Sequence, residues 1–273
     1  MHTNVIQRQY DEVIAEHYDL DAYGVIGRSL GRALDQIRRQ TPWAAGGTPL
    51  RALDLGMGTG SFLAMLRTCA GPLRPYGIDL SQKMIDIART KVPGLVAAVD
   101  DAANLDGHFA GEEFDLICTH YVTGFVPMAV LAPKIRDRLA PGGYWSLVGG
   151  TKAGFPVLQQ KANGRAARLL FGGRSADVEG RVCNPADRDE VVRTFEAHGF
   201  AVRQCETFTP RLDFKNLDEF LAFAYYGGWL TPFIEALGLH RARALTRAAI
   251  SGLFFPVTDH HTIEIALAQK VGP

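Results

Sequence analysis

The sequence contains little of what would place a chain in a specialised structural class. Its four cysteines, Cys69, Cys118, Cys183 and Cys205, are scattered among 273 residues, and no Cys-x-x-Cys pair occurs. This scatter argues against a structural zinc site and against a disulfide framework, and it favours a reducing, cytoplasmic location. No histidine is spaced from a carboxylate as a metal site requires, so no metal is expected.

An excess of charge and a long apolar run are also missing. Lysine plus arginine and aspartate plus glutamate each total 29, so the formal net charge is zero and nucleic acid is not an expected partner. No apolar run approaches the length of a membrane span, and the amino terminus shows no signal-peptide pattern. Because 47% of the residues are hydrophobic, the chain is able to bury one sizeable core, and we expect a single domain over residues 1–273.

The most informative stretch is residues 51–62, RALDLGMGTGSF. Residues 52–55 predict a buried strand, residues 56–60 a glycine-rich turn, and the following residues a helix. Alternate glycines let the backbone turn tightly and let a ligand approach the main chain. The helix presents unpaired N–H groups and a partial positive charge at the turn. This combination favours a nucleotide-like cofactor that carries a carboxylate or a phosphate.

The glycine spacing separates two kinds of cofactor. Dinucleotide enzymes use Gly-x-Gly-x-x-Gly, whereas this segment reads Asp-Leu-Gly-Met-Gly-Thr-Gly. It resembles the signature of the class I S-adenosylmethionine (SAM)-dependent methyltransferases. In that family the loop passes under the methionine part of the cofactor, which implies cofactor contacts by Asp54, Gly56, Met57, Gly58 and Gly60.

The resemblance also implies a fold. We expect a Rossmann-like, doubly wound α/β sheet of seven strands in the order 3-2-1-4-5-7-6, with the seventh strand antiparallel. The motif Leu-Ala-Pro-Gly-Gly at residues 139–143, before a fifth strand, is a second mark of these enzymes.

Two later segments supply candidate contacts for the nucleoside. Residues 76–80 predict a second strand that carries Asp79, 19 positions after Gly60, and an acid there accepts hydrogen bonds from ribose hydroxyls. Ser81 predicts a helix N-cap. The resemblance places Leu80 and Met84 beside the adenine.

A third strand over residues 95–99 leads into Asp100-Asp101-Ala102. The family often has Asp-Ala-x-x-Leu here, with the aspartate accepting from the adenine amino group. Asp101 and Ala102 fit that register, and Asp100 is the competing assignment.

The fourth strand, residues 114–119, delivers polar side chains to the edge where the methyl group should lie. We assign Thr119 to the cofactor and Tyr121 to the substrate. His120 is the best candidate general base, because an imidazole titrates near working pH. The alternative is a histidine that only shapes the pocket. His260 and His261 are weaker candidates on the same rim.

Residues 1–40 are expected to form a helical lid. The pattern Tyr-Asp-x-x-Ala-x-x-Tyr-Asp around residues 10–19 resembles the small-molecule branch that includes the quinone- and biotin-pathway methyltransferases. There the helix closes over the cofactor, which makes Tyr18 a candidate cofactor contact and Tyr10 a candidate substrate contact. The alternative is that both tyrosines only fasten the helix to the core.

Two insertions are expected to cover the pocket of the core at residues 50–150. Residues 151–186 follow strand five, and residues 208–261 connect strand six (201–207) to strand seven (262–269). Ligands bind at the carboxyl ends of parallel strands, where both insertions lie. The second is rich in aromatic residues, of which Tyr225, Tyr226 and Trp229 are assigned to the substrate. A small core within the lid is the alternative for each of them.

The sequence therefore predicts a methyltransferase that uses SAM, releases S-adenosylhomocysteine (SAH) and acts on an apolar or aromatic small molecule. The acceptor atom (O, N, S or C), the pathway and the oligomeric state are not indicated. One rival is a non-catalytic SAM-binding module, which would lack an open acceptor pocket. A nicotinamide-dependent oxidoreductase is less favoured because the glycine spacing differs.

Overall fold

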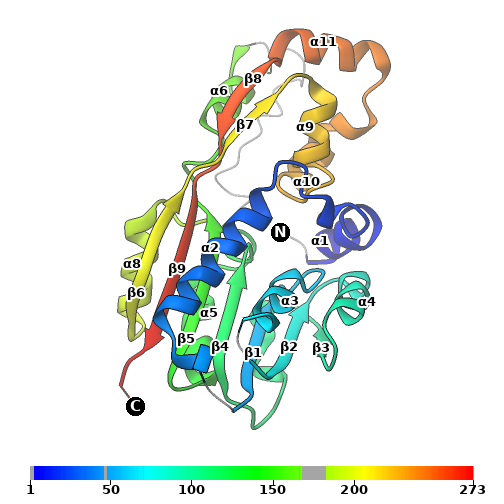
Figure 1. The fold of residues 1–273 in the computed structure, drawn as a ribbon. Helices are drawn as coiled ribbons and strands as arrows, with labels where there is room; N and C mark the ends of the chain where they lie inside the picture. Colours follow the sequence, from blue (N-terminus) through cyan, green and yellow to red (C-terminus); the bar gives the residue numbers. More distant parts are fainter. Residues whose placement is uncertain (1–2, 46–47, 70, 166, 168–182, 273) are drawn as a thin grey trace.

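The fold is built on one central sheet, seen in a computed structural model that describes residues 3–45, 48–69, 71–165, 167 and 183–272. The sheet has seven strands in the order β3-β2-β1-β4-β5-β9-β6 (Figure 1). The first five are parallel, and β9 is antiparallel to both β5 and β6. With β9 as the seventh strand, the predicted order is confirmed. The strands are β1 Leu50–Leu55, β2 Leu73–Asp79, β3 Val96–Val99, β4 Phe114–His120, β5 Leu139–Gly150, β6 Phe200–Phe208 and β9 Ile263–Lys270.

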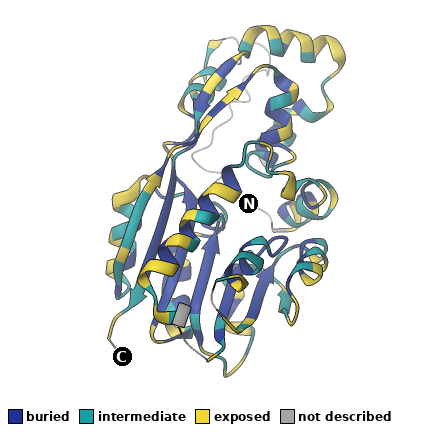
Figure 2. Ribbon diagram, viewed as in Figure 1, coloured by how far each residue is buried: buried dark blue, intermediate teal, exposed yellow. Residues whose placement is uncertain are grey.

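Helices cover both faces of this sheet because alternate strand residues point in opposite directions. Ala52 of β1 and Cys118 of β4 pack on the face covered by α2, α3 and α4. Leu53 and Ile117, their chain neighbours, pack on the face covered by α5 and α8. Figure 2 shows the central strands as buried almost throughout. The helices are α2 Val25–Gln40, α3 Ser61–Arg67, α4 Gln82–Lys91, α5 Met128–Arg138 and α8 Arg188–Ala197.

Local signals in the sequence fix several helix ends. The Ser81 hydroxyl accepts the Met84 N–H at 3.1 Å, as predicted for the N-cap of α4. Asp187 caps α8 in the same way. Short 3₁₀ segments occur at Pro42–Ala45 and Ala102–Gly107.

The helical lid expected over residues 1–40 is not one continuous helix. Helix α1, Thr3–Gln9, runs into a π-helical turn at Tyr10–Ile14, and α2 begins only at Val25, after a 3₁₀ turn at Tyr18–Leu20. Asp21 ends the 3₁₀ turn with a φ of 37°, and its carboxylate accepts the N–H groups of residues 26 and 27 in the first turn of α2.

The second insertion contains a feature that the sequence analysis missed. A two-stranded antiparallel sheet, β7 Arg211–Phe214 with β8 Val257–His260, extends β6 and β9 beyond the main sheet (Figure 1). It carries the lid helices α9 Leu217–Ala224, α10 Thr231–Leu237 and α11 Ala244–Phe254, with a 3₁₀ turn at Leu239–Arg241.

The first insertion is only partly described. Helix α6, Pro156–Ala162, joins the lid, since the N–H groups of Val157 and Leu158 donate to the Asp259 carboxylate of β8. The expected insertion at 151–186 otherwise lies largely outside the described residues.

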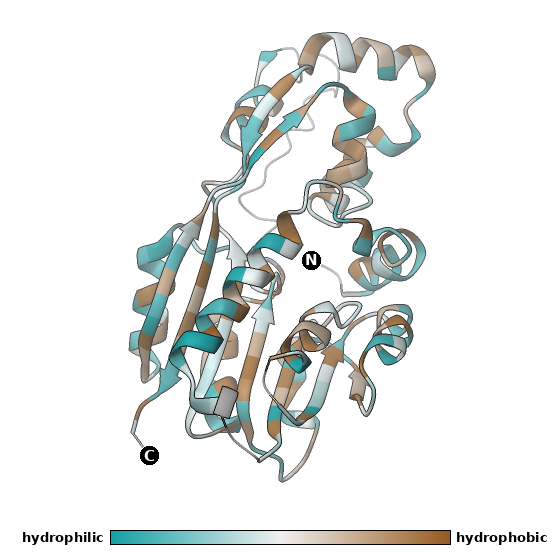
Figure 3. Cartoon of the chain, viewed as in Figure 1, coloured by the Kyte–Doolittle hydropathy of each residue, from teal (hydrophilic) through white to brown (hydrophobic). Residues whose placement is uncertain are grey.

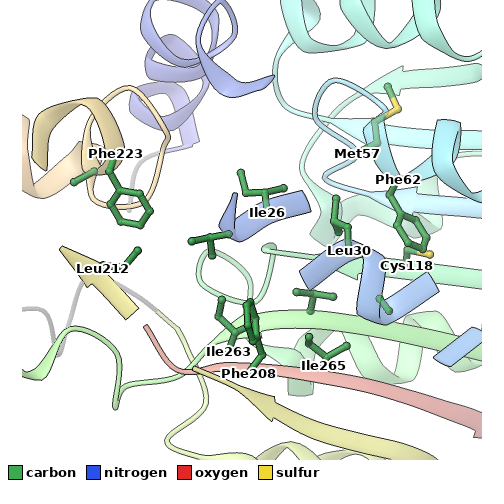
Figure 4. Close-up of a cluster of buried hydrophobic side chains, with 14 of the residues drawn as sticks. Ile26, Leu30, Met57, Phe62, Cys118, Phe208, Leu212, Phe223, Ile263 and Ile265 are labelled. Atoms are coloured by element: carbon green, nitrogen blue, oxygen red, sulfur yellow. The ribbon is translucent and has the colours of Figure 1, made fainter. Parts of the chain in front are cut away.

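One apolar cluster runs from the core into the lid. Figure 4 shows Ile26 of α2 and Cys118 of β4 in the same cluster as Leu212 of β7 and Phe223 of α9. The lid is therefore packed on the core through side chains as well as joined to it by strands. No helix in the described part of the chain has the length and apolar character needed to cross a bilayer.

Candidate active site

The glycine-rich turn between β1 and α3 requires glycine at its ends. Gly56 has a φ of 67°, and a Cβ there would lie 2.4 Å from a methyl carbon of Val122. A Cβ on Gly60, at φ 74°, would lie 2.9 Å from Ala88. The N–H groups of Gly56 and Met57 donate to the Ile78 carbonyl, which ties the turn to β2. Neighbouring side chains therefore pack directly against the backbone of this turn, which only glycine permits, and Gly56 and Gly58 also line the cavity described below.

Asp79 links the turn to the end of β2. One carboxylate oxygen accepts the Gly58 N–H at 2.7 Å, and the other accepts the Ser81 N–H at 2.9 Å. Burial raises the pKa of Asp79 to about 6, although these two hydrogen bonds act in the opposite direction. The predicted loop and the predicted acid therefore form one unit.

Asp54 lies beneath this unit rather than on its surface. Its side chain is buried, and Oδ1 has no hydrogen-bond partner among the described residues. Burial, together with the nearby Asp79 carboxylate, raises the pKa of Asp54 well above its ordinary value. Two acids close together in a low-dielectric site favour a cationic ligand.

A cavity with about 800 Å³ of free space opens above the turn; we call it the cofactor cavity. Ten residues assigned from the sequence line it: Tyr10, Tyr18, Gly56, Gly58, Asp79, Leu80, Asp101, Ala102, His120 and Tyr121. Asp100 lines it too. The sequence analysis missed Ile6, Val122, Phe125 and Val126.

Three predicted cofactor contacts point into the protein core instead. The Met57 thioether packs against Gly77, and Met84 is buried with Ile14 in a small cluster under the amino-terminal turn. The Thr119 hydroxyl accepts the indole N–H of Trp145 at 2.8 Å. Thr119 and His120 are neighbours on a strand, so their side chains point to opposite faces, and only His120 reaches the cavity.

The two candidate aspartates after β3, Asp100 and Asp101, differ in the hydrogen bonds that their carboxylates accept. Asp100 accepts from Asn104 at 2.7 Å and lies 2.8 Å from a ring nitrogen of His108. These contacts lower the pKa of Asp100. Asp101 uses Oδ1 to accept the Ala103 N–H at 2.9 Å, and it has a second carboxylate oxygen. Asp101 therefore has more hydrogen-bonding capacity left for a ligand.

The amino-terminal segment closes over the glycine-rich turn. The Tyr18 ring lies 3.5 Å from where a Cβ on Gly58 would be. Asp19 accepts from the Thr59 hydroxyl at 2.6 Å and from Lys91 at 2.5 Å. The Asp11 carboxylate accepts from the Ser81 hydroxyl at 2.5 Å. These bonds anchor the amino-terminal segment to the glycine-rich turn and to both ends of α4, and its role as a lid stays a prediction.

A second cavity, which we call the inner chamber, adjoins the first. It shares Tyr10, Tyr18, Tyr121 and Phe125 with the cofactor cavity and is closed on the lid side by residues 227–229. The Trp229 ring stacks on Phe223 and meets Tyr121 edge-on, with centroids 5.3 and 4.9 Å apart. The chamber is thus walled mainly by aromatic rings, and Asn184 adds an amide.

Tyr121 is held in an unusual conformation at the border between the two cavities. Its φ is 61°, which is uncommon for a bulky residue and is found where surrounding structure enforces it. Its hydroxyl lies 2.6 Å from the Ser29 hydroxyl of α2.

The two lid tyrosines assigned to the substrate lie elsewhere. Tyr225 is buried, its hydroxyl donates to Glu235 at 3.3 Å, and its ring stacks on His240, so it serves the lid's own packing. Tyr226 is 40% exposed and lies at the seam with the amino-terminal segment, edge-on to His17. Of the three lid aromatics assigned to the substrate, only Trp229 lines the inner chamber.

His120 is buried on the cavity wall. Its Nε2 lies 3.1 Å from the Ser146 hydroxyl, and its ring meets Phe62 edge-on at 4.2 Å. Burial lowers the pKa of His120 to about 3. The expectation that it titrates near working pH is therefore wrong for the free protein, because an apolar, enclosed site disfavours the imidazolium.

The two weaker candidates for a general base, His260 and His261, do not line the cofactor cavity. His261 is buried and stacked on Phe155, and burial lowers its pKa to about 3. His260 is half exposed on β8 of the lid ribbon.

The fold and the site together define a class of protein. It is a doubly wound α/β domain in which a glycine-rich turn, a strand-end acid and the carboxyl ends of parallel strands surround one cavity.

Comparison with known proteins narrows this class. Residues 52–143 match the family model for a methyltransferase domain. A trans-aconitate 2-methyltransferase from Methylobacterium radiotolerans is 35% identical over 96 residues, which are 35% of this chain and 36% of that protein. A carboxy-S-adenosyl-L-methionine synthase from Wolinella succinogenes is 30% identical over 145 residues, 50% of this chain and 59% of that one. The chain thus spans about one third of the length of the first of these curated relatives and about three fifths of the length of the second.

A solved structure covers nearly the whole chain. The SAM-dependent methyltransferase from Geobacter sulfurreducens, in complex with SAH, aligns with a TM-score of 0.56 over 98% of each chain at 15% identity. At this identity the likeness concerns the fold. The family match concerns the methyltransferase domain at residues 52–143, and the structural match shows that the chain shares the fold of a SAM-dependent methyltransferase.

Proposed function

We propose that this protein transfers a methyl group from SAM to an apolar or aromatic small molecule. The observation that carries the proposal is the pair of adjoining cavities that share Tyr10, Tyr18, Tyr121 and Phe125. One is built from a glycine-rich turn and carboxylates, and the other from aromatic rings. Two ligands of different chemistry would meet at the shared wall, as a group transfer requires.

The residues around the turn fit SAM. When bound, SAM supplies an electrophilic methyl group on a cationic sulfonium, and its transfer leaves SAH. Asp79 would accept from the ribose hydroxyls, and Asp101 from the adenine amino group. Asp54 is buried with an unpartnered oxygen, and a positively charged ligand above it would favour its ionised form. Leu80 and Ala102 supply the apolar surface for the adenine.

The protein's contribution to the transfer step is alignment and exclusion of water. The acceptor's lone pair attacks the methyl carbon while the carbon–sulfur bond electrons move to sulfur. Tyr18 and Tyr121 border both cavities and would hold the reacting groups in line. The closed amino-terminal segment shields this junction from solvent.

His120 has two candidate roles. A pKa of about 3 makes it a weak base in the free protein, which favours a neutral imidazole that positions the acceptor by hydrogen bonding. The role of general base, expected from the sequence, requires that bound ligands raise this pKa. An acceptor that carries a proton, such as an alcohol or phenol, would need that role, whereas a carboxylate or thioether would not.

Calorimetric titration separates this proposal from its rivals. A methyltransferase binds SAM and SAH and does not bind NADH, whereas an oxidoreductase does the reverse. A non-catalytic SAM-binding module would also bind SAM, so an assay for SAH release separates this rival. Such a module would form no SAH from SAM in the presence of any co-purifying small molecule. The open inner chamber next to the cofactor cavity favours an enzyme over such a module.

A further inference from the structure

The lid contains a third cavity that the methyl-transfer site does not use. It has about 870 Å³ of free space, part of it open to solvent, and lies among α6, α9, α10 and α11. Its wall includes Leu158, Phe220, Ile234, Leu237, Ile250 and Phe254. Figure 3 shows apolar residues along α9, α10 and α11. We call it the lid cavity.

The polar groups on this wall are already engaged. The Lys161 ammonium donates to the Phe254 carbonyl at 2.6 Å, and the Gln159 amide donates to the carbonyls of Lys152 and Gly154. The part of the wall that the structure describes therefore offers a ligand almost only carbon. An ion or a sugar would lose its hydration there without compensation, whereas a hydrocarbon would gain from burial.

The walls of the lid cavity are packed into the lid rather than loose. Lid residues that face the cavity, such as Phe220 and Ile234, are buried. A preformed apolar space with ordered walls is the usual form of a site for an apolar ligand.

The lid cavity adjoins the inner chamber through one residue. Phe233 lines both, with Trp229 on the chamber side and Leu230 on the lid side. The three cavities thus form a series, from cofactor cavity to inner chamber to lid cavity, with shared walls at each junction.

We propose that the lid cavity holds an aliphatic chain of the methyl acceptor. The acceptor would then be an amphiphile, with its reacting polar end in the inner chamber and its chain passing Phe233 into the lid. This inference rests on the proposed function, because the acceptor end is placed by the methyl-transfer site.

The test uses straight-chain alcohols from hexan-1-ol to tetradecan-1-ol, titrated into the SAH-saturated protein by calorimetry. Affinity should rise with each added methylene, by up to about four-fold per CH₂, until the cavity is full. Failure of every alcohol to bind, with SAH still bound, would overturn the lid proposal and leave the proposed function intact. Failure of SAH itself to bind would instead overturn the proposed function.

Variants that fill the lid cavity test whether the aliphatic chain of the ligand binds there. Leu158→Trp and Leu237→Trp add bulk at partly exposed wall positions on α6 and α10. Each should weaken dodecan-1-ol binding at least ten-fold and leave SAH affinity unchanged. The matched control is Leu245→Trp on α11, which makes the same change at a site 87% exposed and off the cavity wall. Equal affinity in all three variants would place the alcohol elsewhere and contradict the proposal.

A labelling experiment on the unmodified protein covers the case in which the tryptophan variants fail to fold. A dodecyl alcohol with a diazirine at its terminal carbon is photolysed in the complex, and the labelled peptides are identified by mass spectrometry. Labels should fall in residues 155–162, 217–220, 230–239 or 250–255. Labels confined to other residues of the protein would refute the proposal that the lid cavity binds the aliphatic chain of the acceptor.

Discussion

The two halves of the proposed site would recognise ligands by different means. The cofactor half offers the glycine-rich turn and carboxylates at the ends of β1, β2 and β3, all within residues 54–101. The acceptor half uses side chains from four separate regions, residues 10–26, 121–125, 184 and 227–233. The first half is set by local spacing along the chain, and the second exists only after the lid has packed on the core. Substitutions in the two halves should therefore separate cofactor affinity from turnover.

The largest effect should come from the turn itself. Gly56→Ala forces a Cβ to within 2.4 Å of Val122 at a positive φ, and we expect it to destabilise the fold by about 2–4 kcal/mol. Denaturant unfolding measures this. Gly94→Ala is the matched control, because Gly94 has a φ of 79° with nothing within 4 Å. It should cost about 1 kcal/mol. Equal losses would mean that contact with Val122 contributes nothing.

The next effect concerns the cofactor half alone. Asp79→Ala removes a carboxylate that would accept ribose hydrogen bonds, and SAH affinity should fall by about 1.5–3 kcal/mol. Calorimetry measures the change. The variant also frees the Gly58 N–H, so thermal unfolding serves as the control for a folded protein. Wild-type affinity in a folded Asp79→Ala protein would remove Asp79 from the cofactor site.

A substitution in the acceptor half should lower turnover and leave cofactor affinity nearly unchanged. Trp229→Ala deletes the ring that stacks on Phe223 and meets Tyr121, and turnover should fall by about ten-fold, from a loss of 0.5–1.5 kcal/mol per aromatic pair. SAH affinity should stay within a few-fold of wild type. Tyr225→Phe is the control, because that hydroxyl contacts Glu235 rather than a cavity. A parallel loss of SAH binding in Trp229→Ala would show a structural role.

Cofactor binding should also depend on pH. The pKa of Asp79 is raised to about 6, and ribose hydroxyls would donate only to its ionised form. Binding then requires loss of a proton below pH 6, so SAH affinity at pH 5 should be about ten-fold lower than at pH 7. Asp79→Asn cannot ionise and should show a flat profile. A wild-type profile that is equally flat would contradict this assignment.

The smallest effect is expected at His120. If the neutral imidazole only positions the acceptor, His120→Gln retains a hydrogen bond and turnover should fall less than about ten-fold, with an unchanged pH profile. A general base would give a loss of about 10²-fold or more. Steady-state rates between pH 5 and 9 distinguish the two roles, and SAH affinity confirms an intact cofactor site.

The sequence predicted the core and most of the cofactor cavity because both follow from short-range rules. The strand–glycine–helix pattern, the Ser81 cap and Asp79 depend on neighbours a few positions away. Thr119 does not line the cofactor cavity, because side chains alternate between the two faces of β4. Once His120 faces the cavity, Thr119 faces Trp145.

The acceptor half was less predictable for a physical reason. β7 has only four residues, and its pairing with β8 joins segments over forty positions apart, which no local pattern records. The division of lid aromatics between chamber and core also depends on tertiary packing. Trp229 and Tyr225 are four positions apart, yet only Trp229 reaches the inner chamber.

The central claim is that the turn between β1 and α3 and Asp79 form a SAM site. Its most direct test is calorimetric titration of the 273-residue protein with SAH and, separately, with NADH at pH 7.5. The account predicts one-to-one binding of SAH that Asp79→Ala weakens by about 10- to 150-fold, and no heat from NADH. Binding of NADH in preference to SAH, or SAH binding that is indifferent to Asp79, would contradict it.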